Sequence, residues 1–289
     1  MTRTMEWAAR GDHMRGIPRK MVIMAVGAFA KAVANFLNTT TVHNGDQLIN
    51  LVRSRPPGVP LITVSNHMST LDDPVMWGFK GFPIFDSNLA RWALAAEDIC
   101  FKNPLLTYFF RTGNHFFLLI FVYCSQCPVF RTLVHYCQLH TFPEGKVSQE
   151  DAPIRRLKWG TASLIVRSPV TPIVLPIVHR GFEEVMPESF LFGRRPPFPL
   201  CNKSINIVIG EPMEFNLPKM TQMAISMSRN LHNPTRGWPI LSPSGLDEAA
   251  QRCLYTSISE QIHTSMESLR SLSKKLSGAK SLNSGHVEE

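Results

Sequence analysis

The sequence lacks the features that mark several common protein classes. Its one long N-terminal apolar run, residues 21–37, is interrupted by Lys31, whereas a membrane-spanning helix needs about 20 apolar residues with few charges. It also shows no secretory signal peptide, and its six cysteines are unevenly spread. We therefore expect reduced thiols in a cytosol-facing compartment rather than a disulfide framework.

The charge balance points to an anionic partner, although the signatures of nucleic-acid binding are missing. The chain carries 30 Lys and Arg against 22 Asp and Glu, a net charge of +8. Such an excess favours nucleic acid or an acidic membrane surface. There is no zinc-finger array, RNA-binding aromatic signature or long basic run. We therefore expect membrane phospholipids and no nucleic acid as partners.

Two further chemistries have weak support. Zinc-ligating residue types occur between residues 124 and 140, but in a short apolar segment, and we predict no metal site; these residues are Cys124, Cys127, His135, Cys137 and His140. A serine hydrolase would need Ser65 or Ser69 in a Gly-x-Ser-x-Gly elbow, and no such elbow is present.

The pattern of apolar residues predicts a single α/β domain. The composition, 44% hydrophobic and 18% charged, is that of a globular protein with a sizeable core. Apolar runs predict strands and apolar stripes at helical spacing predict helices. We expect a mixed, mostly parallel sheet flanked by helices. Strands are expected at 41–44, 61–64, 91–99, 139–142, 170–178 and 205–209, and helices at 46–52, 105–110, 158–167 and 246–269, the last capped by Ser244.

The two ends of the chain differ in composition from this domain. Residues 1–40 combine a basic start with the apolar run, and Arg19, Lys20 and Lys31 suit an interfacial or re-entrant helix at a membrane surface. The alternative is an N-terminal helix packed on the domain. The domain itself is expected to span 41–275, with a loop or lid at 215–243. The Ser/Gly-rich tail 276–289 is predicted to be disordered.

One stretch carries the chemistry. The buried strand 61–64 runs into Ser65-Asn66-His67, and the segment Asp72-Asp73-Pro74 opens the next helix. A histidine and an aspartate five apart across such a turn can face each other. The carboxylate then holds one ring N–H, which leaves the other ring nitrogen free to take a proton. His67 and Asp72 are therefore a candidate general base and its orienting carboxylate, and the plain alternative is that they only tie the turn.

Two later blocks complete a pattern: Phe142-Pro143-Glu144-Gly145-Lys146 and Ile173-Val174-Leu175-Pro176-Ile177-Val178. With His-x-x-x-x-Asp, in this order, they resemble the glycerophospholipid acyltransferase superfamily. The doubled Asp72-Asp73 and the sequence Ala96-Glu97-Asp98-Ile99-Cys100 are similar to the tafazzin branch and its plant members, which include N-acylphosphatidylethanolamine synthases. The resemblance covers residues 40–113 and 139–275.

The resemblance implies an acyl transfer. The acyl chain would come from acyl-CoA or a phospholipid, with no other cofactor, and would go to a lysophospholipid or to the amine of phosphatidylethanolamine. Glu144, Gly145 and Lys146 would belong to the acceptor site, and Arg131 would be the family's phosphate-binding arginine. The protein would be membrane-associated, peripheral or interfacial, at a mitochondrial or plasma membrane.

The segment 114–141 departs from the family pattern. The apolar run 116–123 has no family counterpart, and only residues 132–141 separate Arg131 from Phe142, too few for the expected turn and helix. The alternative reading is therefore a non-catalytic membrane-associated homologue, or a splice form, with a disrupted acceptor site.

Overall fold

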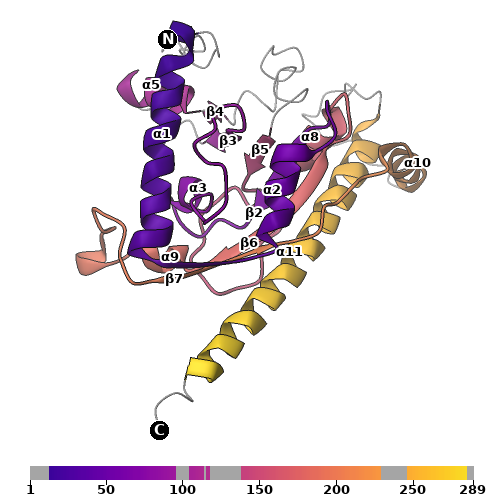
Figure 1. The fold of residues 1–289 in the computed structure, drawn as a ribbon. Helices are drawn as coiled ribbons and strands as arrows, with labels where there is room; N and C mark the ends of the chain where they lie inside the picture. Colours follow the sequence, from indigo (N-terminus) through magenta and orange to yellow (C-terminus); the bar gives the residue numbers. More distant parts are fainter. Residues whose placement is uncertain (1–12, 96–103, 114, 118–137, 229–245, 285–289) are drawn as a thin grey trace.

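The computed structural model describes residues 13–95, 104–113, 115–117, 138–228 and 246–284. Its described strands form one seven-stranded sheet in the order β1-β7-β6-β2-β5-β3-β4. Neighbouring strands are parallel except for β6 and β7. The predicted α/β fold with a mostly parallel sheet is confirmed (Figure 1). The strands are β1 (Thr39–His43), β2 (Leu61–Ser65), β3 (Trp92–Ala95), β4 (His115–Phe117), β5 (Gln138–Thr141), β6 (Ile173–Arg180) and β7 (Ser204–Ile209).

Helices cover both faces of this sheet. Successive side chains of a strand point to opposite faces, so β2 sends Leu61 to one core and Ile62 to the other. Since both cores are apolar, the central strands read as nearly continuous hydrophobic runs. The helices are α1 (Ile17–Lys31, continued as a π-helix over Ala32–Leu37), α2 (Gly45–Ser54), α3 (Asp72–Val75), α5 (Pro104–Thr112), α8 (Gly160–Arg167), α9 (Phe182–Val185), α10 (Leu217–Ser228) and α11 (Glu248–Ser284).

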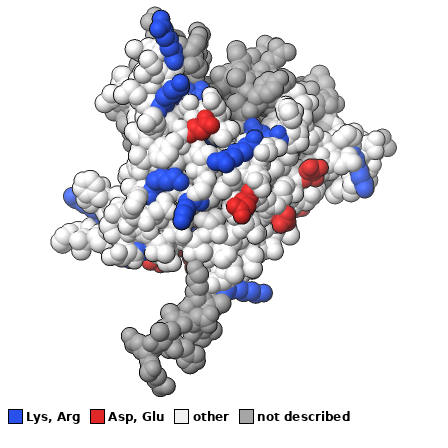
Figure 2. Space-filling model, in the orientation of Figure 1, with Lys and Arg blue, Asp and Glu red and all other residues white. Residues whose placement is uncertain are grey.

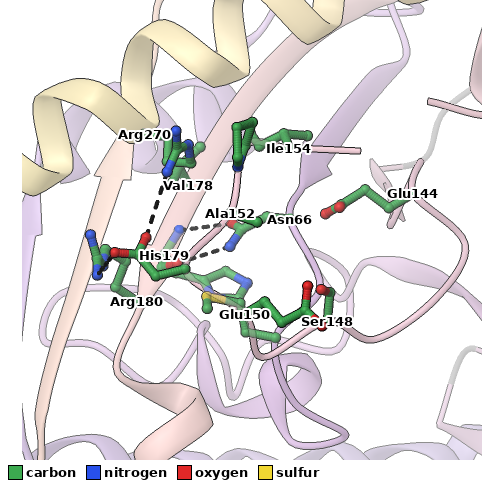
Figure 3. A pocket seen from close by; sticks show the side chains of 13 residues that line it. Asn66, Glu144, Ser148, Glu150, Ala152, Ile154, Val178, His179, Arg180 and Arg270 are labelled. Atoms are coloured by element: carbon green, nitrogen blue, oxygen red, sulfur yellow. Dashed lines mark hydrogen bonds and ion pairs between the residues drawn. The ribbon is translucent and has the colours of Figure 1, made fainter. Parts of the chain in front are cut away.

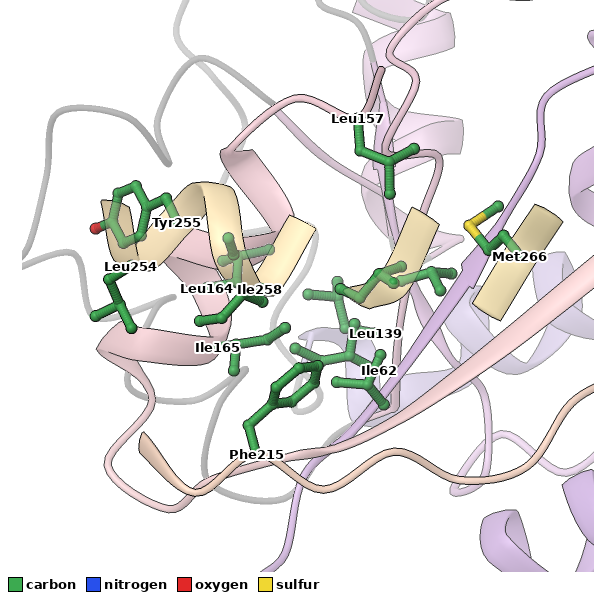
Figure 4. Packing of buried hydrophobic residues seen from close by; sticks show 14 of the residues in the cluster. Ile62, Leu139, Leu157, Leu164, Ile165, Phe215, Leu254, Tyr255, Ile258 and Met266 are labelled. Carbon is green, nitrogen blue, oxygen red and sulfur yellow. The ribbon is translucent and has the colours of Figure 1, made fainter. Parts of the chain in front are cut away.

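The long helix α11 closes one face. The predicted stripe on it, which includes Leu254, Ile258 and Met266, is buried against the sheet and α8 (Figure 4). Its first turn is capped by Asp247, whose side chain accepts the N–H of Ala250 at 2.7 Å. The predicted cap, Ser244, lies outside the described residues.

Two predictions made for the C-terminal third were wrong. Residues 217–228 form α10, which packs against α11, rather than part of a loop. Low hydrophobic periodicity hid this helix, because only Ala224 and Ser228 are buried. Residues 276–284 continue α11 and are not a disordered tail, because helix geometry propagates beyond the packed stripe at little cost per residue.

The N-terminal helix packs one face against the domain, as the alternative reading predicted, and its placement at a membrane interface stays a prediction. Ala30, Val33 and Ala34 are buried against the domain, and the Lys31 ammonium donates to the carbonyl of Phe79 at 2.9 Å. The opposite face exposes apolar side chains, among them Met21 at 66%. By length and composition the helical stretch His13–Leu37 is also sufficient to cross a membrane.

Parallel pairing decides where the site lies. In the register of the sheet Val64 pairs with Thr141, and Ser65 pairs with Ile177. The segments that leave β2 and β5 therefore emerge at the same edge as the end of β6. The carboxyl ends of parallel strands are where open α/β sheets bind ligands.

Candidate active site

The turn after β2 is fixed by a reciprocal pair of hydrogen bonds. The side-chain amide of Asn66 donates to the carbonyl of His179 at 2.9 Å, and its oxygen accepts the N–H of His179 at 3.0 Å (Figure 3). These bonds tie the start of the turn to β6, the strand that pairs with β2. His67, the next residue, is therefore held at the edge of the sheet.

Asp72 gathers the turn around one carboxylate oxygen. Its Oδ2 lies 2.9 Å from Nδ1 of His67 and accepts the N–H groups of Met68 at 2.7 Å and Ser69 at 2.9 Å. Asp72 is fully buried. Because a carboxylate only accepts, Nδ1 of His67 is the protonated nitrogen and Nε2 is free to take a proton. The spacing predicted from the sequence therefore produces the expected geometry.

The His67 ring is held but reachable. It stacks on Phe142, with the ring centroids 4.0 Å apart and the planes at 17°. Its side chain keeps 21% of its surface exposed, whereas Asp72 keeps none. A substrate can therefore contact the imidazole, and it cannot contact the carboxylate.

Glu144 braces this turn from β5. One of its oxygens accepts the backbone N–H of His67 at 3.3 Å and the other accepts the N–H of Arg155 at 3.2 Å. Burial raises the pKa of the Glu144 carboxyl, against the backbone hydrogen bonds, which lower it. In this structure Glu144 joins two loops at the site.

The other residues predicted for the acceptor site lie further out. Gly145 has a φ of +64°, and an added Cβ would meet the Lys158 ammonium at 2.7 Å, so this turn favours glycine. Lys146 is exposed at the surface. Arg131 lies outside the described residues, so its predicted phosphate contact stays a prediction.

Two buried histidines at the site were not predicted as functional residues. Nε2 of His179 lies 3.7 Å from Asp72 Oδ2, beyond hydrogen-bond distance. His140 has its ring nitrogens 3.0 Å and 3.3 Å from the hydroxyls of Thr63 and Ser65. Only the sheet order brings them here, since short-range spacing gives no signal for either. Burial lowers the pKa of both imidazoles, for His140 well below its usual range.

These pKa shifts predict a loss of stability on mild acidification. A histidine with a lowered folded-state pKa stays neutral while the unfolded chain takes up a proton below its ordinary value of 6.5. The free energy of unfolding should therefore fall with falling pH, by up to about 1.4 kcal/mol per pH unit for each histidine. Glu144 acts in the opposite sense, because its raised pKa favours the folded state as pH falls.

Urea unfolding between about pH 5 and pH 7.5 measures this slope. His140→Gln removes one of the two titrating groups and should reduce the slope by about half. An identical slope in the parent and in His140→Gln would contradict the assignment to His140.

Asp73 has a different role from its neighbour. It forms an ion pair with Arg91, and the guanidinium of Arg91 lies 4.6 Å from the centre of the Trp77 ring. Burial lowers the pKa of Arg91 to about 9. Breaking a buried pair of this kind by removing one partner is costly, so Asp73 anchors the start of α3 to Arg91.

An apolar groove starts beside the turn. It has a volume of about 420 Å³ and runs between α1, the turn and the segment before β3. Thr70 and Leu71, between His67 and Asp72 in the chain, contribute to its lining. A polar pocket of about 40 Å³ lies on the other side, between Asn66, Glu144 and Arg270 (Figure 3). The groove has the size of a small-molecule site, whereas the pocket holds only a few waters.

Comparison with known proteins decides the family. A family model described as Acyltransferase matches residues 40–180. N-acylphosphatidylethanolamine synthase of Arabidopsis thaliana is 60% identical over 284 residues, covering 96% of this chain and 100% of the relative. The chain belongs to the acyltransferase family. Tafazzin of Drosophila melanogaster is 38% identical over 205 residues, covering 68% of this chain and 52% of that protein. The protein is thus an acyltransferase of the tafazzin-like branch, as the doubled Asp72-Asp73 and the segment 96–100 predicted.

The zinc alternative finds no support in the described part of the chain. There, no three or more His, Cys, Asp or Glu side chains are grouped as metal ligands. Of the zinc-type residues in that segment only His140 is described, and the others lie outside these ranges. The prediction of no metal site therefore stays a prediction.

Proposed function

We propose that the protein transfers an acyl chain from acyl-CoA to the amine of phosphatidylethanolamine, with His67 as general base. The main support for this proposal is the 60% identity to N-acylphosphatidylethanolamine synthase of Arabidopsis thaliana along that protein's whole length. The His67–Asp72 pair at 2.9 Å supplies the base that such a transfer needs.

The proposed steps follow from the geometry of the turn. The amine nitrogen attacks the thioester carbonyl carbon while Nε2 of His67 takes the proton that the nitrogen loses. Asp72 holds Nδ1–H and stabilises the imidazolium that forms. Collapse of the tetrahedral intermediate breaks the C–S bond, and the proton passes from Nε2 to the leaving thiolate. His67 is then neutral again.

The groove provides room for the acyl chain. Its lining is largely apolar, with Ile23 and Val26 of α1 on one side and Ile84 and Leu89 on the other. Thr70 and Leu71, which also line it, belong to the segment between His67 and Asp72. In the proposed reaction the acyl chain lies in the groove with its carboxyl end at this segment, near the base.

The test is a transfer assay with purified full-length protein in mixed vesicles. Acyl-CoA with a labelled acyl chain is supplied together with phosphatidylethanolamine, and each lipid is scored for label by mass spectrometry. We expect N-acylphosphatidylethanolamine as the main labelled product. Label that appears only in phosphatidylcholine or another O-acylated lipid would exclude N-acylation.

Exchange between a phospholipid and a lysophospholipid is the second candidate. The 38% identity to tafazzin of Drosophila melanogaster favours it. The same vesicles carry it out if label moves from a chain-labelled phospholipid to a lysophospholipid without acyl-CoA. The turn would act in the same way, with the hydroxyl of the acceptor as nucleophile.

Residues 118–137 allow a direct test of the inactive alternative. They lie outside the described ranges, and β4 uses only the start of the unusual segment. We expect the chain as written to turn over more slowly than a variant rebuilt to the family pattern at 114–141. Angstrom-scale misplacement of a phosphate-binding group can cost about 100-fold. Equal turnover at matched vesicle-bound protein would show that the segment is harmless.

Membrane attachment is proposed to be peripheral and to depend on residues 17–38. The Lys31 ammonium donates to carbonyls of Phe79 and Phe82, and the Asn35 amide donates to the carbonyl of Gly78 at 2.6 Å. A spanning helix would have to break these contacts. We therefore expect alkaline carbonate to release the protein from membranes. Full retention, with the N-terminus protected from protease, would indicate a span instead.

A further inference from the structure

An exposed loop between α9 and β7 has no role in folding that explains its side chains. This Phe192 loop, residues 187–200, carries Phe192 at 97% exposure and Phe198 at 76%. Leu191 is 67% exposed and Phe190 is 44% exposed. Isolated exposed apolar residues are common, whereas four within nine residues form a patch that marks an interaction site.

The backbone of the loop holds these side chains outward. Phe190 donates its N–H to the carbonyl of Arg194 at 3.0 Å, which closes a tight turn at the tip. Within it Phe192 has a φ of +57°, a conformation that favours glycine. An aromatic side chain kept in this conformation and almost fully exposed contributes nothing to the core. We therefore expect the ring to be buried by a binding partner outside this chain.

The base of the loop is connected to the catalytic turn. The carbonyl of Met186 accepts the Ser69 hydroxyl at 3.4 Å and the Gln149 amide at 3.0 Å. The backbone N–H of Ser69 in turn donates to Asp72. On the other side Leu200 donates its N–H to the carbonyl of Val185 at 2.8 Å. The base of the loop is therefore held directly against the turn.

The loop also continues the exposed face of α1. The N–H of Asn202 donates to the carbonyl of Leu37 at 2.7 Å, and Phe36 beside it is 86% exposed. In Figure 1 the loop extends from the body beside the lower end of α1, on the same side of the molecule. Figure 2 shows this corner as mainly uncharged surface with basic side chains at its edge.

The charge of the loop fits an anionic surface. Arg195 pairs with Glu188 at 2.8 Å across the stem. The exposed side chain of Arg194 forms no ion pair with any residue of the described ranges. Apolar side chains at a tip with a free cation beside them are the arrangement of segments that enter the interface of a membrane with anionic lipids.

We propose that the Phe192 loop is a second membrane contact, which inserts its aromatic side chains below the headgroups and places Arg194 at the lipid phosphates. This inference rests on the proposed function, since a substrate held in a bilayer must reach His67 from that bilayer. The loop and α1 then contact the same membrane and fix the orientation of the site toward it. The occupant is the lipid surface, not another protein.

Vesicle sedimentation of the full chain tests the insertion. The double variant Phe192→Ser/Phe198→Ser should lower partitioning onto phosphatidylcholine vesicles containing phosphatidylglycerol by about tenfold. Leu272→Ser is the matched control, because Leu272 is 42% exposed on α11, across the sheet from α1; its partitioning should change less than about twofold. Arg194→Gln should weaken binding only when phosphatidylglycerol is present. Unchanged partitioning of the double variant would overturn the proposal.

A second measurement places residue 192 in the membrane. Phe192→Trp is compared with the parent in vesicles whose lipid chains are brominated, and we expect additional quenched emission in the variant. No additional quenching, or a double variant that changes only the oligomeric state, would assign the loop to a protein contact and overturn the proposal. The acyl-transfer assay, run beside this measurement, separates the two inferences. Quenching without acyl transfer in the parent would refute the proposed function alone, and transfer without quenching would refute the loop alone.

Discussion

His67→Ala should reduce acyl transfer by at least about 100-fold, the typical contribution of a general base. Nε2 of His67 is the free nitrogen of a ring whose other nitrogen is held by Asp72 at 2.9 Å. Alanine removes the base and leaves Asp72 with the backbone N–H groups of Met68 and Ser69. The turn should therefore stay folded. Initial rates in the vesicle assay, beside circular dichroism and vesicle binding, measure the effect.

The control for this variant is His43→Ala. His43 lies on β1, at the edge of the sheet and three strands away from β2 in the sheet order. We expect turnover within about twofold of the parent for this replacement, because His43 is half-buried on the edge strand β1 and lies outside the site. A His67→Ala protein that binds vesicles and turns over near the parent rate would refute the assignment of the base.

Asp72→Asn should cost on the order of 100- to 10,000-fold in turnover, by analogy with the orienting carboxylate of serine proteases. Oδ2 of Asp72 accepts three hydrogen bonds, one from His67 and two from the backbone. An asparagine oxygen in this place is neutral and cannot stabilise the imidazolium. In one orientation of the asparagine, its NH2 group takes the place of Oδ1, which has no hydrogen-bond partner among the described residues. In the opposite orientation the NH2 group takes the place of Oδ2 and faces three hydrogen-bond donors, which it cannot accept from.

The measurement is kcat and KM for Asp72→Asn beside Asp86→Asn. Asp86 is exposed, and its carboxylate accepts the backbone N–H of the nearby Asn88 at 2.8 Å. We expect Asp72→Asn to lower kcat with little change in KM, because the carboxylate is buried and does not reach substrate. A rise in KM alone, with kcat unchanged, would mean that Asp72 supports binding and not the base. Asp72→Ala should in addition destabilise the fold by about 1–3 kcal/mol for each N–H left unsatisfied.

The sequence by itself determined the local part of the site. His67 and Asp72 are five residues apart, so a strand, a tight turn and a short helix suffice to join them. The buried strands and the stripe of α11 were predictable for the same reason, since side-chain periodicity follows from the geometry of each element alone. The three sequence blocks likewise predicted the family that the comparisons show.

Only the tertiary structure decided which distant residues join that turn. Glu144 contacts it from 77 positions away and the Asn66–His179 pair spans 113 positions. Sheet order and register create these contacts, and no local pattern encodes either of them. No local pattern predicted α10 either, because this helix is defined by its packing on α11. Nor did the sequence predict which face of α1 is buried and which is exposed. The outward side chains of the Phe192 loop also needed the fold, because a Pro-rich sequence predicts a loop and does not predict which of its side chains stay exposed.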